Sequence, residues 1–243
     1  MRDDGQAELL ERVRALRAAG SGPKQVARAL GLQPAQAGVL LRRAAEAAHT
    51  ATMPGEREVV GCWVNAGWST GLDLSTRPAW AAQDVGAGEG AVGAGFAQLL
   101  VARRERASRV TVCGLLVDVY CLGVKNVIAP QSIGEGSLQA HRRSYFSAFD
   151  APSLPIGIEQ AQAIAYGAVS YARGLGFEPA PGFADAAVVL GEPADGLPAI
   201  GFGNEGLPFY LNGPRDDARA ILATLERTCG AGKYHYLLAS GPM

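Results

Sequence analysis

The segment from Asp118 to Asn126 (DVYCLGVKN) contains the residues outside the first fifty whose types and spacing best suit chemistry. Asp118 shares one face of a predicted strand with apolar residues, so its carboxylate is expected to point into apolar surroundings. A buried carboxylate needs a partner, which Lys125 or an arginine could supply. Ionisable groups in such surroundings concentrate at active sites.

Cys121 lies in the same segment and could act as a nucleophile, with His141 or His235 as its base. The alternative is a structural ion pair beside an ordinary buried thiol, and this structural interpretation is the one we favour. Asp118, Cys121 and Lys125 are therefore weak catalytic candidates. The sequence leaves open whether the protein is an enzyme.

A glycine-rich segment, Asp84–Gly90 (DVGAGEG), resembles the first motif of S-adenosylmethionine-dependent methyltransferases, and Gly88–Gly93 satisfies G-x-G-x-x-G. That motif needs a buried strand before the glycines and a helix after them. The residues upstream include Pro78 and few β-branched side chains, so the strand is missing. A methyltransferase is therefore a weak alternative, with Asp118 as the acid for the cofactor's ribose. The 32 glycines of the chain offer a compositional explanation for the segment.

The composition excludes several classes of protein. The 243 residues include 22 basic and 23 acidic side chains and are 48% apolar, which argues against low-complexity disorder and a polyanion-coating protein. No apolar run reaches the roughly 18 residues of a membrane span, and the first residues do not form a signal peptide. We therefore expect a cytoplasmic protein. The four cysteines contain no C-x-x-C and the three histidines no H-E-x-x-H, so neither a metal nor a cofactor is expected.

Charge and turn-forming residues divide the chain into two predicted domains. Residues 11–43 hold seven basic residues and one acidic residue, a net charge of +6, whereas the whole chain carries −1. The stretch 50–57 breaks the helical pattern with a Pro-Gly pair and is the predicted linker. We therefore expect a basic domain at 1–49 and a second domain at 58–243, with different partners.

The first domain is predicted to contain three short helices. Apolar residues recur at helical spacing from Leu9 to Leu16, and a second helix begins at Pro23, where the missing N–H costs nothing. This helix stops at Gly31. The third is predicted to run to about residue 48 and contains Gly38, which costs about 1 kcal/mol relative to alanine.

Residues 23–40 (PKQVARALGLQPAQAGVL) resemble the helix-turn-helix module of bacterial DNA-binding proteins. In that family a small residue lies where the two helices approach closely, here Ala27, and a glycine permits the left-handed turn, here Gly31. The resemblance covers about residues 7–48. It implies that the third helix enters the major groove of double-stranded DNA.

The resemblance also implies roles for individual side chains. Gln33 and Gln36 are the candidate base readers, because glutamine pairs bidentately with adenine. The side chains expected to contact phosphates are Lys24, Arg28, Arg42 and Arg43. A three-helix domain also serves for oligomerisation or protein docking, and that alternative stays open, as does a homodimer.

From residue 58 onward the pattern predicts an α+β domain with a mainly antiparallel sheet and two long helices. Strands are predicted at 58–65, 97–103 and 110–122, the last two forming a hairpin, at 198–203 and 208–212, forming a second hairpin, and at 234–238. Helices are predicted at 155–175, 183–190 and 216–229. The residues from about 67 to 95 are predicted to form a long loop, which is unusual and often functional.

Three functions remain open on the sequence alone. The leading hypothesis is a DNA-binding protein, a transcriptional regulator or DNA-associated accessory protein, whose larger domain dimerises, senses a ligand or contacts a protein partner. The second is an enzyme with its chemistry in the larger domain, and the third is a purely structural interaction protein.

Overall fold

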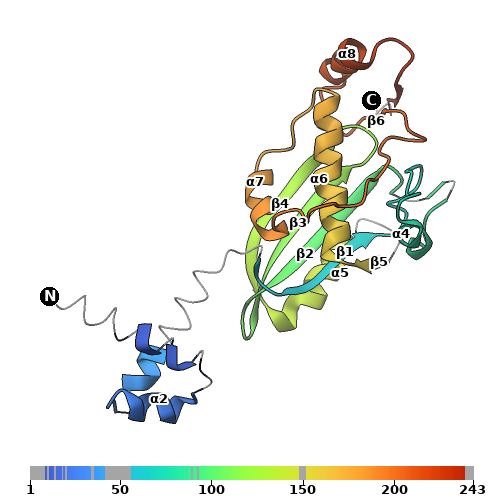
Figure 1. Ribbon diagram of the computed structural model, residues 1–243. Coiled ribbons are helices and arrows are strands. Elements are labelled where there is room, and N and C mark those ends of the chain that lie inside the picture. Colours follow the sequence, from blue (N-terminus) through green and yellow to red (C-terminus); the bar gives the residue numbers. More distant parts are fainter. Residues whose placement is uncertain are drawn as a thin grey trace. The chain divides into compact units, whose positions relative to one another are not determined.

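The computed structural model describes residues 9, 11–13, 15–17, 19, 21–33, 36–41, 56–88, 90–91, 93–147 and 152–238 (Figure 1). The chain divides into two compact units, Met1–Met53 and Pro54–Met243.

Within the first unit, three stretches of the chain contribute helical residues to one apolar cluster. The helix α2 (Pro23–Ala29) is preceded by helical residues between 9 and 17 and followed by helical residues 36–41. The buried side chains of the cluster are Val13, Val26 and Leu40, and five partly buried leucines surround them. These contacts unite segments that would be marginal as isolated helices in water.

The second unit is built on a five-stranded antiparallel sheet with the order β4-β3-β2-β1-β5 (Figure 1). Its strands are β1 (Val59–Asn65), β2 (Phe96–Arg106), β3 (Arg109–Asp118), β4 (Gly123–Gly134) and β5 (Ser153–Ile156). The predicted α+β class is confirmed, as is the hairpin of β2 and β3, in which Leu99 lies opposite Leu115.

The central part of the sheet is buried on both faces. On one face Leu99 and Leu115 belong to the main apolar core, and on the other Leu100 and Val112 belong to a second apolar cluster. The covering helices are α6 (Ile158–Gly174) and α7 (Phe183–Leu190) on the first face and α5 (Leu138–Phe146) on the second. Burial on both faces explains why β3 is an almost continuous apolar run.

A small parallel sheet completes the second unit. It pairs β6 (Phe209–Leu211) with β7 (His235–Leu237), and Tyr210 packs against Leu225 of α8 (Ala218–Cys229). The predicted hairpin of 198–203 with 208–212 is therefore wrong. Asn204 and Leu207 do close a tight turn, but the two segments then separate because each finds another partner.

Two further differences from the predicted elements concern the sheet edges. Residues 155 and 156, predicted as the start of the long helix, belong instead to the strand β5, and the helix begins at Ile158. Pro155 is tolerated in β5 because β5 is an edge strand. The predicted strand 110–122 ends at Asp118, and a turn leads into β4. Gly123, with φ +67°, permits that turn. Three of the described helices were not predicted: α4 (Pro78–Gln83), the 3-10 helix η2 (Glu135–Ser137) and α5.

Candidate functional site

The predicted DNA-contacting residues that the structure describes lie on the surface of the first unit. Lys24, Arg28, Gln33 and Gln36 are all exposed. The Gln33 N–H donates to Gln36 Oε1 at 3.2 Å, so the Gln36 side chain caps the start of the helical stretch 36–41. This bond engages the oxygen that Gln36 would need for a bidentate contact with adenine. Arg42 and Arg43 lie outside the described residues, and their phosphate contacts stay predictions.

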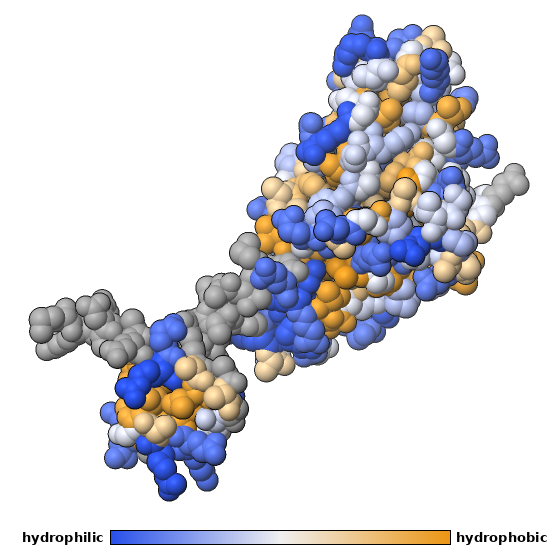
Figure 2. Space-filling model, in the orientation of Figure 1, coloured by the Kyte–Doolittle hydropathy of each residue, from blue (hydrophilic) through white to orange (hydrophobic). Residues whose placement is uncertain are grey.

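The chain between the two helical stretches makes a tight turn. Gly31 has φ +63°, in the left-handed region, and the Leu32 N–H donates to the Ala27 carbonyl at 2.9 Å. Figure 2 shows hydrophobic residues gathered in the middle of the visible face of this unit, with hydrophilic residues around them. A groove of about 340 Å³ in this unit is lined by Pro23, Lys24, Ala27, Ala37, Gly38 and Leu41.

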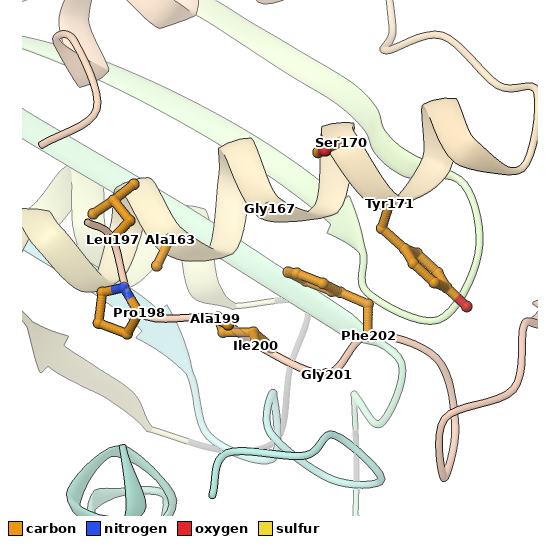
Figure 3. A pocket seen from close by; sticks show the side chains of 10 residues that line it. All are labelled: Ala163, Gly167, Ser170, Tyr171, Leu197, Pro198, Ala199, Ile200, Gly201 and Phe202. Atoms are coloured by element: carbon orange, nitrogen blue, oxygen red, sulfur yellow. The ribbon is translucent and has the colours of Figure 1, made fainter. Parts of the chain in front are cut away.

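In the second unit, a groove of about 520 Å³ runs between α6 and the extended segment 197–202 (Figure 3). The helix wall consists of the small residues Ala163, Gly167 and Ser170 together with Tyr171, and none of the ten lining residues is charged. Gly167 lets the two walls approach, because a Cβ there would lie 2.7 Å from the Phe202 ring. The groove can therefore accept an uncharged molecule, with the Ser170 hydroxyl as a polar contact.

Tyr171 lies between this groove and the end of β3, where Asp118 and Cys121 are located. Its ring stacks on Phe202 at a centroid distance of 5.7 Å, and its hydroxyl points away from the other lining residues (Figure 3). That hydroxyl is buried and has no hydrogen-bond partner among the described residues. Burial raises the pKa of Tyr171, and the nearby Cys121 and Asp118 raise it further.

Asp118 is buried, as the strand pattern predicts, with 2% of its surface exposed. Its Oδ1 accepts the backbone N–H groups of Tyr120 and Cys121 at 3.0 and 2.9 Å, whereas Oδ2 finds no partner among the described residues. Burial raises the pKa of Asp118 to about 7, although the charge of Lys125 and the N–H donors oppose the rise. The carboxyl group thus holds the turn between β3 and β4 in shape.

The ion pair of Lys125 is with Asp216, which the sequence analysis did not select. Lys125 Nζ lies 2.6 Å from Asp216 Oδ2, and that carboxylate also accepts from the Gly213 N–H and the Tyr210 hydroxyl. Burial opposes ionisation of Asp216, but the bonds from Lys125 and Gly213 outweigh it and keep its pKa below the usual value. The sequence feature that could have indicated Asp216 is the pair of aspartates before α8. The second of them, Asp217, caps that helix.

Cys121 lies in a different environment from the two predicted bases. It is packed with Leu122, Tyr210 and Leu225, and burial raises the pKa of its thiol, which keeps the sulfur protonated. His141 belongs to α5, and His235 is an exposed residue of β7. No hydrogen bond joins either histidine to the thiol in the described part of the chain, which favours the structural interpretation of Cys121.

The glycine-rich segment that follows α4 is held by Asp84. This buried carboxylate accepts the Gly67 N–H at 2.6 Å and both the N–H and the hydroxyl of Ser69. A short helix precedes the glycines and β2 follows them, so their surroundings lack the strand-then-helix arrangement that a methyltransferase motif requires. Asp84 is a structural residue of the loop that the sequence analysis missed.

The described residues contain neither a metal-binding cluster nor a helix that could span a membrane. They hold no group of three or more His, Cys, Asp or Glu side chains suited to a metal ion. None of the described helices has the length and hydrophobicity that crossing a bilayer requires. No protein-family model matches the chain, and neither curated protein sequences nor solved structures yield a significant match.

Proposed function

We propose that the protein binds double-stranded DNA through its first unit. One observation carries this proposal: the left-handed turn at Gly31 follows α2, and the two helical stretches on either side bury Val26, Ala27, Ala37 and Leu40. Two helices that pack at small residues around such a turn are what the helix-turn-helix resemblance requires.

The distribution of polar side chains supports the same proposal. Lys24 and Arg28 lie on the exposed side of α2, where cations can contact phosphates. Gln33 lies at the start of the next helical stretch, where side chains reach base edges in the major groove. Because Gln36 caps that stretch, Gln33 is the better placed of the two base readers.

Binding of the full chain to a random-sequence duplex, measured from about 50 to 200 mM salt, tests the proposal. We expect Lys24→Ala and Arg28→Ala each to weaken binding and to reduce the slope of log K against log salt by about 0.9. The charge-matched control is Arg219→Ala, at an exposed position of α8. Absence of binding at about 50 mM salt, or slopes unchanged in both variants, would contradict the proposal.

For the second unit, we propose that the groove beside α6 binds a small uncharged ligand. The uncharged lining and the volume of about 520 Å³ favour this role over partner docking or dimerisation. In a thermal-shift screen of neutral aromatic compounds, we expect some compounds to raise the melting temperature of the wild type. The same compounds should not stabilise Ser170→Leu, because the leucine side chain fills the groove. Equal shifts in both proteins would contradict this assignment. S-adenosylmethionine serves as the charged comparison, and a shift with it would favour the enzyme alternative.

A further inference from the structure

We propose that Val39 contacts the C5-methyl group of a thymine and so helps to determine which DNA sequence the protein prefers. This inference rests on the proposed DNA binding of the first unit. It adds an apolar base contact to the polar contact expected of Gln33, and it assigns the protein a target containing a T·A pair.

Val39 differs from the other large apolar residues described in the first unit because its side chain is exposed. It is 43% exposed, whereas Ala37 and Leu40 on the same helical stretch are 2% and 8% exposed. Val39 follows Gln36 by three residues, so the two side chains lie on the same side of the helix. That side is the one presented to solvent, since Gln36 is exposed as well.

The chemistry of valine selects one feature of the major groove. An isopropyl group has no hydrogen-bond donor or acceptor, and the thymine methyl is the apolar group that a base pair displays in that groove. Contact between the two removes apolar surface of both from water. A polar base edge in the same place would lose hydrogen bonds to water without compensation.

Gly38, the residue before Val39, has no side chain that could project from the helix surface beside it. A Cβ added at Gly38 would meet no heavy atom within 4 Å, so packing within the described structure does not require glycine there. Glycine costs about 1 kcal/mol relative to alanine inside a helix. The missing side chain at position 38 leaves the neighbouring side chain of Val39 uncovered on that flank, so a base edge can approach it.

The test uses the full chain and a chemical change confined to one methyl group. A preferred duplex is first selected from a random pool, and a second duplex is then made with deoxyuridine in place of each thymidine in turn. At one position we expect uracil to weaken binding about four-fold, the value for one methyl group withdrawn from water. Val39→Ala should bind the thymine and uracil duplexes equally well, and it improves helix propensity, so the helix is retained.

The matched control is Val188→Ala, which removes an equally exposed valine from α7 and should preserve the thymine preference. Failure to bind any duplex would refute the proposed DNA binding itself. A selected duplex that is bound equally with thymine and uracil, or a thymine preference that survives Val39→Ala, would refute the inference about Val39 and leave DNA binding intact.

Discussion

Asp118 combines two opposite influences on one carboxyl group. Two backbone N–H donors favour its charge, but it lies where water does not reach it, and burial raises its pKa from 3.8 to about 7. The folded state therefore binds this proton more tightly than the unfolded state does. It follows that Asp118 lowers the free energy of unfolding progressively as the pH rises from about 4 to about 7.

Replacing Asp118 by asparagine should therefore stabilise the protein above neutral pH. Asparagine keeps an oxygen for the Tyr120 and Cys121 N–H groups and carries no charge to bury. We expect the free energy of unfolding at pH 8 to rise on the order of 2 kcal/mol, with the gain shrinking as the pH falls towards 4. Thermal unfolding between pH 4 and 8 measures this change.

The control for this prediction is Asp195→Asn, which removes the same charge from an exposed loop position. It should leave the pH dependence of unfolding unchanged. A stability gain for Asp118→Asn that is the same at pH 4 and pH 8 would show that the charge of Asp118 is not the cause.

At the scale of elements, the C-terminus of α7 depends on side chains from other elements. Its last carbonyl groups have no partner within the helix and are buried, so they need donors from elsewhere. Arg103 of β2 donates to the Val189 carbonyl at 2.5 Å and to the Leu190 carbonyl at 2.9 Å. Gln162 of α6 also donates to Leu190, at 3.1 Å. The positive charge of Arg103 also suits the negative end of the helix dipole.

Arg103→Met should consequently destabilise the second unit. Methionine fills similar space but leaves buried carbonyl groups without donors, so we expect the free energy of unfolding to fall by roughly 3 kcal/mol. Urea unfolding of the full chain measures the loss. Arg106→Met, at the exposed end of the same strand, should change stability by less than about 0.5 kcal/mol. Equal effects of the two substitutions would disprove the role given to Arg103.

At the scale of the whole molecule, the second unit contains all that its own fold requires. Pro54–Met243 includes the five strands and the helices that cover both faces of the sheet. We expect residues 54–243, expressed alone, to show cooperative thermal unfolding and to lack the DNA affinity of the full chain. An unfolded product would contradict the first expectation, and retained DNA affinity the second.

The net charges of the two parts differ in a way that the chain total hides. Residues 1–50 carry eight basic and five acidic residues, a net charge of +3, and the remaining residues carry −4. The total near zero argues against a protein that coats a polyanion along its whole chain, but it does not argue against binding of a polyanion by the first part alone. The distribution of charge along the chain, and not its total, is what bears on the proposed binding of DNA.

Much of the sheet could be predicted because its interior strands are dominated by apolar and β-branched residues. The edge strand β4 was missed because only two of its twelve residues are buried, and Pro130 and Asn126 interrupt its apolar pattern. The tight turn at 204–207 was predicted from local turn residues, but the hairpin expected around it does not form. The segments on either side of this turn pair elsewhere: Gly201 pairs with Asp73, and Phe209 pairs with His235. No local sequence pattern indicates these two partners.

By itself, the sequence determined the α+β class and antiparallel pairing of the larger part, because hydrophobic periodicity and turn residues act locally. It also identified Asp118 as a buried acid from alternation along one strand. Only the tertiary structure decided that Lys125 pairs with Asp216, that Tyr171 lies between a groove and Asp118, and that Arg103 caps α7. These contacts join residues far apart in the chain, and their geometry depends on how whole elements pack.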